Sequence, residues 1–585
     1  FAPLASALAE LIVDPTASQA FKPSLGSSST GVPVVNIVAP TAGGVSHNKF
    51  NDYDIGSTGL IHNNSLTSGT AKLGGTVGAN PNFSGTAATT IVNEVTSSNT
   101  SLLAGRAEVF GNKAGLIIAN PNGITCNGCG PLNASRFTLT TGVPDYDSGN
   151  NDSLYFDVTG GLITIDGNGL EGLDIPEASV IARQIVLSGY ISDALRVDLV
   201  SGGLRYDYSP TLGGDVQSAI TEQSLSNAGI TYQIDASTLS SVSAGKINII
   251  GNDDGVGVRI QGDVTASASD LVIDADGNLT ISSNLSSERD TTITTGGTAA
   301  SVTTSNTVDA GRDLSITTTG AVTNSGTLQA SRRLTIDADG DVTNSGTATA
   351  AQVVISDAAD ITNSGSIQAG LNELLFTSTG EEATLAALSE DIAAAINSNE
   401  GFQGFHAYIP AGTTPGVIYI SIEPPYYFAD MEITVAVPVT GSDTQTFTYT
   451  STGPYTGRLD ITGLVEASDQ YRIQAYGDVT IGSSSNKVGS LSNSGSGASI
   501  TSYDDISVTA SGAISNASSA TITADDDTTL TSDATLTQNS AVTAGGDLTL
   551  SGNDLSLASG AGISSQAGGT LSLVETGVGS DFTYA

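Results

Sequence analysis

The sequence contains no tryptophan, one methionine and only 18 lysine and arginine residues, against 59 aspartate and glutamate residues. Binding to nucleic acid or to an anionic lipid surface requires a basic face that neutralises phosphates. The formal net charge of −41 therefore predicts no nucleic-acid partner and no docking on anionic membranes. The same acidity suits solubility outside the cell and the attraction of divalent cations.

Long hydrophobic runs are also missing, so no direct insertion into a membrane is predicted. Two cysteines in 585 residues are few for a cytosolic protein, and their closeness in the chain indicates an oxidising compartment. The first seven residues, Phe1–Ala7, are typical of the tail of a signal peptide with a small-x-small cleavage site, and equally of an ordinary disordered N-terminus.

Glycine, serine, threonine and asparagine are abundant, and short apolar segments alternate with them. One pattern repeats every 19 or 20 residues, with Asn-Ser-Gly triplets at Asn324, Asn344 and Asn363. It returns after a break at Asn493 and, degraded, at Asn516 and Asn539. A repeat this short cannot bury its own apolar face, whereas stacked coils can. The predicted fold class is all-β, a right-handed parallel β-helix with asparagine or serine ladders at its turns.

Residues 371–460 interrupt the repeat. The stretch 381–399 has the capping box and the apolar spacing of a helix. Eleven of the 30 phenylalanines and tyrosines lie between Phe376 and Tyr455. The interval is therefore predicted to be a small inserted α+β domain with its own core, containing four strands at Phe405–Ile409, Val417–Ile422, Met431–Val437 and Gln445–Thr450.

Two Asn-Pro-Asn turns, at 80–82 and 120–122, mark the first 145 residues. Proline fixes φ, and the Asn-Gly of the second turn supplies the positive φ of a tight reversal. Around them run HNKFNDYDIGSTGLIHNNS (47–65), NEVTSSNTSLLAGRAEVFG (93–111), IANPNGITCNGCG (118–130) and N-x-S-R-x-T-L-T-T-G (133–142). These ordered motifs resemble the secretion domain of filamentous-haemagglutinin-like two-partner-secretion exoproteins.

The resemblance implies a large bacterial adhesin, secreted to the cell surface or the medium by a dedicated outer-membrane two-partner-secretion transporter. It implies a secretion motif made of Asn80, Pro81, Asn82, Asn120, Pro121, Asn122, Gly123 and Ile124. The predicted organisation is a secretion domain with an N-terminal cap and hairpin decorations (1–265), β-helix repeats (266–370), the inserted domain (371–460) and further β-helix repeats (461–585). One decorating hairpin is predicted to join Arg196–Val200 to Leu204–Tyr208.

Cys126 and Cys129 match C-x-x-C. The chain offers no further ligands at zinc spacing, and no βαβ context for a thioredoxin-like site. A local disulfide is favoured over free thiols. The three histidines, His47, His62 and His406, are expected to be structural, and no catalytic constellation is recognisable, so the chain is predicted not to be an enzyme.

Aspartate-rich loops at 274–278 and 337–341 begin like calcium loops but lack the closing glutamate, and the run Asp525–Asp527 is expected to be a solvated turn with at most weak affinity for a cation. Turn chemistry explains them, so no cofactor or metal is predicted beyond weak Ca²⁺ binding. Tyr408, Tyr426, Tyr427 and Phe428 are candidate contacts for a carbohydrate or a matrix polymer, because aromatic faces suit sugar rings. The alternative is that these rings fill the core of the inserted domain.

Three functions remain open. The first is a secreted adhesin that mediates attachment to cells, matrix or host. The second is the stalk of a contact-dependent growth-inhibition toxin, whose active domain would lie beyond residue 585. The third is a polysaccharide-acting β-helix enzyme.

Overall fold

The computed structural model describes residues 11–147, 153–171, 175–208, 216–227, 229–370, 477–566 and 568–577. Between 371 and 476 it describes strands β43–β49 with residues 393–394 and 409, and near the C-terminus residues 583–584. The expected signal-peptide tail lies outside the described residues. The chain divides into two units, residues 1–287 with 294–302, and residues 288–293 with 303–585.

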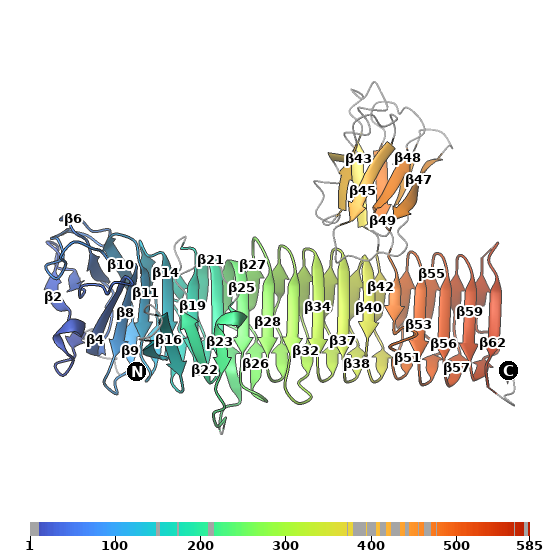
Figure 1. The fold of residues 1–585 in the computed structure, drawn as a ribbon. Helices are drawn as coiled ribbons and strands as arrows, with labels where there is room; N and C mark the ends of the chain where they lie inside the picture. Colours follow the sequence, from blue (N-terminus) through green and yellow to red (C-terminus); the bar gives the residue numbers. More distant parts are fainter. Residues whose placement is uncertain are drawn as a thin grey trace, which may run out of the picture. The chain divides into compact units, whose positions relative to one another are not determined.

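The first unit is a stack of coils whose strands form parallel sheets (Figure 1). The first sheet contains β4 (Val45–Tyr53), β8 (Thr90–Val95), β11 (Gly115–Ala119), β14 (Arg136–Thr140), β19 (Ala178–Ala182), β21 (Tyr190–Ser201), β25 (Ser241–Gly251) and β28 (Leu271–Ala275). The second contains β9 (Ser101–Leu103), β12 (Ile124–Cys126), β17 (Leu162–Ile165), β20 (Gln184–Leu187), β24 (Tyr232–Ala236), β26 (Gly257–Ile260) and β29 (Leu279–Ile281).

A third group of strands completes the coils. In the N-terminal coils it comprises β3 (Pro33–Asn36), β5 (Leu60–Asn64), β10 (Arg106–Gly111) and β13 (Gly130–Leu132). In later coils β18 (Leu170–Glu171), β27 (Asp263–Ala266) and β30 (Leu285–Ser287) continue this side and join the first sheet through the long strands β21 and β25. Apolar side chains align in register from coil to coil, as Leu116 does with Ile91 and Phe137. All three are buried.

Short antiparallel pieces surround the N-terminal coils. Strand β1 (Leu11–Val13) pairs with β4, and β2 (Ser24–Ser27) pairs with β3. A small hairpin joins β6 (Gly69–Thr70) to β7 (Thr76–Val77). Strands β1 and β2 occupy edge positions next to β4 and β3, where unpaired backbone groups would invite edge-to-edge pairing.

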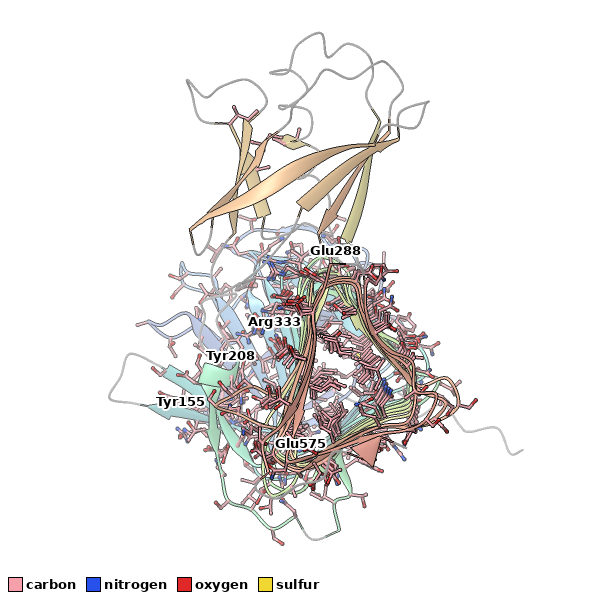
Figure 2. The ribbon with its side chains drawn as sticks, turned by 90° about the vertical axis from the view of Figure 1, so that its right-hand side faces the viewer. Tyr155, Tyr208, Glu288, Arg333 and Glu575 are labelled. Atoms are coloured by element: carbon pink, nitrogen blue, oxygen red, sulfur yellow. A yellow bond between two sulfur atoms is a disulfide. The ribbon has the colours of Figure 1, made fainter. Side chains whose placement is uncertain are left out.

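A separate antiparallel sheet covers part of the first parallel sheet. Its order is β15 (Val143–Asp147), β16 (Ser153–Val158), β22 (Leu204–Tyr208) and β23 (Ile220–Glu222). Its inner face places Phe156 and Tyr208 in one core cluster with coil residues Val92 and Ile117. In Figure 2, Tyr155 labels the outer side of this sheet and Tyr208 lies nearer the coils. This cover explains why coil strands such as β11 are buried on both faces.

The hairpin predicted between 196–200 and 204–208 is wrong. Strand β21 pairs in parallel with β19 on one side and β25 on the other, so its backbone groups are already used. Gly202, with φ at +125°, turns the chain out of the coil, and β22 pairs with β16 and β23 instead.

The second unit repeats a three-strand coil. One row contains β33 (Thr307–Ala310), β36 (Thr327–Ala330), β39 (Thr347–Ala350), β42 (Ser366–Ala369), β52 (Ser499–Ser502), β55 (Thr521–Ala524), β58 (Val542–Ala544) and β61 (Ile563–Ser565). The next contains β34 (Asp313–Thr318), β37 (Arg333–Ala338), β40 (Gln352–Ser356), β50 (Val479–Ile481), β53 (Ile506–Ala510), β56 (Thr528–Ser532), β59 (Leu548–Gly552) and β62 (Leu571–Glu575). The last contains β35 (Val322–Asn324), β38 (Val342–Asn344), β41 (Ile361–Asn363), β51 (Leu491–Asn493), β54 (Ile514–Asn516), β57 (Thr535–Gln538), β60 (Asp554–Leu557) and β63 (Thr583–Tyr584).

The predicted asparagine ladder is present in this last row. The Asn324 amide donates to Asn344 at 2.8 Å, Asn344 to Asn363 at 2.9 Å, Asn363 to Asn493 at 2.9 Å and Asn493 to Asn516 at 3.0 Å. All five side chains are buried. The next position is Gln538, which lies opposite Asn516. The predicted Asn539 is therefore one residue out of frame.

The coils continue directly across the interruption. Strands β40, β41 and β42 pair in parallel with β50, β51 and β52. The intervening chain forms a separate antiparallel sheet in the order β43-β49-β46-β47-β48-β45-β44. Its strands are β43 (Asn372–Thr377), β44 (Phe405–Tyr408), β45 (Val417–Ile422), β46 (Ile433–Pro438), β47 (Thr444–Gly453), β48 (Thr456–Asp460) and β49 (Gln470–Ala475).

The four strands predicted in the interruption correspond to β44–β47. Strand β49 belongs to the same sheet, so the interruption extends to residue 476 and the boundary predicted at 460 is too early. The helix predicted at 381–399 lies outside the described residues except for one helical turn fragment at 393–394. The parallel β-helix itself is confirmed. Within the described ranges, no helix has the length and apolar character to span a membrane.

Candidate functional site

The first Asn-Pro-Asn turn is held by buried amides. The Oδ1 atom of Asn80 accepts the backbone N–H of Asn82 at 2.9 Å, which forms an Asx turn. The Nδ2 atom of Asn80 donates to the carbonyl oxygens of Ile37 and Asn63 at 2.9 and 2.8 Å. Asn82 donates to the Asn36 carbonyl at 2.9 Å. The turn is thereby fixed to two earlier segments of the coil stack.

The second turn has the same construction. Asn120 Oδ1 accepts the N–H of Asn122 at 3.0 Å, and Asn120 Nδ2 donates to the Asn99 carbonyl and to Ser101 Oγ, both at 3.0 Å. Asn122 Nδ2 donates to the Ser97 carbonyl at 2.8 Å.

The residues after this turn fix its geometry. At Gly123, φ is +126°, and a Cβ there would stand 2.8 Å from the Leu162 carbonyl, so a side chain has no room. Ile124 begins β12 and is buried between β9 and β17. The predicted motif residues 80–82 and 120–124 are thus two similar turns, in which the prolines Pro81 and Pro121 are more exposed than the buried asparagines.

Charged motif residues are also structural. His47 Nε2 donates to Glu94 Oε2 at 2.7 Å, and Lys49 Nζ lies 3.3 Å from the same oxygen. Burial raises the pKa of Glu94, but the hydrogen bond and charge of His47, together with Lys49, leave that pKa below its ordinary value. The HNK and NEV motifs therefore join neighbouring strands β4 and β8. Sequence reasoning missed this pair, although both residues stand in the quoted motifs.

His62 lies in the interior with no exposed surface. Its Nδ1 faces the Glu108 carbonyl at 3.3 Å and must donate, so Nε2 accepts from the Tyr53 hydroxyl at 2.6 Å. Burial lowers the pKa of His62 to about 4, against a small opposing effect of the Glu108 carbonyl. The Glu108 carboxylate accepts the N–H groups of Lys72 and Leu73 at 2.8 and 2.7 Å and so holds the β6–β7 hairpin.

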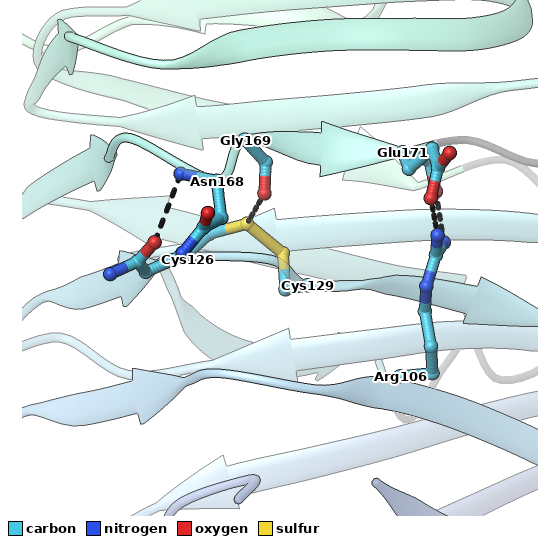
Figure 3. The surroundings of a disulfide bond; sticks show 7 residues. Arg106, Cys126, Cys129, Asn168, Gly169 and Glu171 are labelled. Atoms are coloured by element: carbon cyan, nitrogen blue, oxygen red, sulfur yellow. Dashed lines mark hydrogen bonds and ion pairs between the residues drawn. A yellow bond between two sulfur atoms is a disulfide. The ribbon is translucent and has the colours of Figure 1, made fainter. Parts of the chain in front are cut away.

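Cys126 and Cys129 form a disulfide with Cα atoms 5.3 Å apart. Cys126 Sγ lies 3.2 Å from the Gly169 carbonyl oxygen, and the N–H groups of Gly128 and Cys129 donate to that oxygen. Arg106 forms an ion pair with Glu171 beside it (Figure 3). The disulfide shapes a turn that contacts the next coil.

The remaining predicted site residues belong to the interruption of the coils. Tyr408 lies in β44, opposite Tyr419 of β45, whereas Tyr426, Tyr427 and Phe428 lie outside the described residues. Among the described residues, one acidic group brings three carboxylates within 4.8 Å of one another, and it consists of Asp504, Asp505 and Asp526. Only Asp526 belongs to the run singled out from the sequence.

Comparison with known proteins agrees with these features. The family model of the TPS secretion domain matches residues 9–281. The chain is 36% identical over 290 residues to Toxin CdiA of Yersinia pestis, covering 50% of this chain and 8% of that protein. It is 36% identical over 255 residues to the filamentous hemagglutinin of Bordetella pertussis, covering 43% of this chain and 7% of that protein. The chain thus spans less than a tenth of the length of these curated relatives.

Among solved structures, the filamentous hemagglutinin secretion domain matches with 31% identity over 55% of this chain and 99% of that chain, with a TM-score of 0.42. The matched sequence region contains both Asn-Pro-Asn turns, the His47–Glu94 pair and the disulfide. Residues 9–281 therefore match the TPS secretion domain, the chain is similar to filamentous-haemagglutinin-like two-partner-secretion exoproteins, and it is a secreted protein of the cell surface or the extracellular medium.

Proposed function

We propose that the chain is part of a secreted adhesin, and that an outer-membrane two-partner-secretion transporter recognises its N-terminal coils. The observation that carries the proposal is the shared construction of the two Asn-Pro-Asn turns. In each, a buried asparagine amide fixes the turn to earlier coil segments, and a more exposed proline stands at its tip. Rigid turns of defined shape on a regular scaffold suit recognition by a partner protein.

The test replaces Asn120 and Asn122 with alanine in the full chain, co-expressed with its transporter. The variant loses the Asx turn and the donors to Asn99, Ser101 and Ser97. Secreted protein is expected to fall, while periplasmic protein accumulates or is degraded. The matched control is Asn284→Ala, an exposed asparagine whose side chain has no hydrogen bond to the described residues. Normal export of the double variant would contradict the proposed role of the turns.

The inserted domain is the proposed attachment site. It holds more than a third of the phenylalanines and tyrosines and interrupts coils that otherwise stack directly. The ligand class proposed is a carbohydrate or matrix polymer, with Tyr408, Tyr426, Tyr427 and Phe428 as candidate contacts. Cell-binding and glycan-array measurements compare the full chain with its Tyr426→Ala and Tyr427→Ala variants. Unchanged binding by folded variants would place the site elsewhere.

The stalk of a contact-dependent toxin is the second candidate, because relatives of equal similarity are named as toxins and nucleases. The adhesin and the toxin stalk differ in the part of the gene downstream of these residues. A nuclease-type domain encoded there, with an adjacent immunity gene, would replace the adhesin proposal. A polysaccharide-acting enzyme is the least supported candidate, and a reducing-sugar assay on acidic and neutral glycans tests it.

Weak calcium binding at the run Asp525–Asp527 is a minor proposal, since oxygen-only ligands suit Ca²⁺ and a carboxylate oxygen of Asp526 lies within 4.8 Å of those of Asp504 and Asp505. Calorimetric titration of the full chain with CaCl₂ is expected to give millimolar-range binding that Asp526→Asn weakens. An unchanged titration in that variant would remove the site.

A further inference from the structure

The outer face of the β15-β16-β22-β23 sheet contains a cavity of about 480 Å³. Its lining residues come from all four strands and the 3₁₀ helix Gln217–Ala219, and they are Asp145, Tyr146, Tyr155, Arg205, Asp207, Ser218, Ala219 and Thr221. A cavity of this size lies in the range of small-ligand sites. It belongs to the first unit and contains none of the secretion-motif turns.

Strand register aligns the central residues of the cavity. Asp145 stands opposite Tyr155, and Tyr155 stands opposite Asp207. Neighbouring strands are about 4.8 Å apart, so a carboxylate flanks the tyrosine on each side. Arg205 and Thr221 form the next pair along the same face.

Existing contacts fix part of this arrangement. The Arg205 guanidinium lies over the Tyr155 ring, 4.4 Å from its centroid. Arg205 also pairs with Asp145 at 2.7 Å and with Asp157 at 2.9 Å. These ion pairs neutralise the arginine and hold the tyrosine ring in place. The side-chain carboxylate of Asp207, in contrast, makes no hydrogen bond or ion pair with the described residues.

The chemistry of the cavity suits a hydroxyl-rich ligand. The cavity provides both hydrogen-bond donors and acceptors. The Asp207 carboxylate accepts, the Tyr155 and Thr221 hydroxyls can do either, and the remaining N–H groups of Arg205 donate. An anionic group would be repelled by the Asp207 carboxylate, because Arg205 is already paired with Asp145 and Asp157. A sugar ring carries no charge, uses hydrogen-bond donors and acceptors together, and can place its C–H groups on the aromatic ring.

We propose that this cavity is a saccharide-binding site, with Tyr155 and Asp207 as its principal contacts and Arg205 as the residue that positions Tyr155. The site is independent of the inserted domain and of the transporter-recognition turns. It gives the secretion domain a binding capacity of its own after export.

The test is saturation-transfer NMR on the full chain with three probes: methyl mannoside, methyl galactoside and N-acetylglucosamine. At least one is expected to show transfer that Asp207→Ala or Tyr155→Ala weakens about tenfold or more, the range for losing a charged hydrogen bond. Tyr155→Phe keeps the aromatic ring, and its sugar affinity is expected to lie between those of the wild type and of Tyr155→Ala. Tyr503→Ala and Asp554→Ala, at exposed positions in the other unit, are matched controls without effect.

Three results would overturn the proposal. One is the absence of transfer from every probe. Another is Asp207-dependent binding of a cationic probe, lysine methyl ester, in place of the sugars. The third is sugar binding that disappears when residues 371–476 are deleted, because this would locate the ligand in the inserted domain. Survival of sugar binding in that deletion, with loss in Asp207→Ala, separates this site from the proposed attachment site.

Discussion

Deleting residues 371–476 is expected to leave the coil stack intact. Joining Gly370 to Gly477 leaves three residues between the end of β42 and the start of β50, namely Gly370, Gly477 and Asp478. The native connection from β52 to β53, residues 503–505, has the same length. The strands on either side already pair in register, with Val353 opposite Val479.

The expected energy change is set by loop closure. Exchanging a flexible loop of roughly a hundred residues for a three-residue turn stabilises a fold by at most about 3 kcal/mol. The inserted sheet already brings its ends together, because Asn372 of β43 stands opposite Ala475 of β49. The stability gain should therefore lie between zero and about 3 kcal/mol, with no loss.

Hydrogen exchange of the full chain and the deletion variant, read by mass spectrometry on peptides covering β50–β53, measures this change. Exchange is expected to be unchanged or slower by up to about 100-fold. The control is a deletion of equal length, 368–473, which cuts into β42 and leaves part of β49; it should accelerate exchange. Faster exchange after the 371–476 deletion would show that the insertion supports the coils.

Three further predictions concern residues inside the coils. Asn363→Ala removes the acceptor for Asn344 and the donor to Asn493, and leaving these buried groups unpaired should lower stability by about 3 kcal/mol. Hydrogen exchange in β41 and β51 should therefore accelerate. The control Thr362→Ala, at an exposed position, should leave the exchange rates unchanged. Because burial lowers the pKa of His62 to about 4, the folded state binds fewer protons than the unfolded state, whose histidine pKa is near 6.5. Stability should then fall by about 1.4 kcal/mol per pH unit below pH 6.5 down to about pH 4, and His62→Gln should remove this slope from exchange in β5. Replacing both Cys126 and Cys129 with alanine should lower local stability by about 2 kcal/mol, which is the closure entropy of so short a loop. Unchanged hydrogen exchange in β12 would refute this stabilising role. Export equal to wild type in the same variant would show that the disulfide is not required for secretion.

The repeat was predictable because its signal is local. One buried position in each coil requires an amide side chain, so the same residue type recurs there at intervals of one coil. The recurring residues are Asn324, Asn344 and Asn363. The Asn-Pro-Asn turns were predictable for the same reason, since their Asx geometry involves residues two apart. At 538 the local signal fails, because a glutamine fills the ladder position and Asn539 stands beside it.

Long-range contacts were not predictable in this way. The apolar stretch 180–187 suggests one strand, but Arg183 forms a corner between β19 and β20 and pairs with Asp253 and Asn227 from a later part of the chain. The row Asp145, Tyr155 and Asp207 depends on pairing between β16 and β22, which are far apart in sequence. Alternation along β22 indicated its faces correctly, but not the strand it would join.

The asparagine ladder has a direction. In each internal rung, both amide hydrogens are used by the following coil: Asn344 donates to Asn363 and to the Ser366 carbonyl, and Asn363 donates to Asn493 and to the Ser499 carbonyl. The amide hydrogens of one coil are therefore satisfied only when its C-terminal neighbour is in place, whereas its amide oxygen accepts from the coil before it. At Gln538 both amide atoms are buried without partners among the described residues, so the series of side-chain hydrogen bonds from coil to coil ends there. The stack thus behaves as a series of couplings between neighbouring coils, in which damage at one rung leaves an unsatisfied donor in the coil before it and an unfilled acceptor in the coil after it.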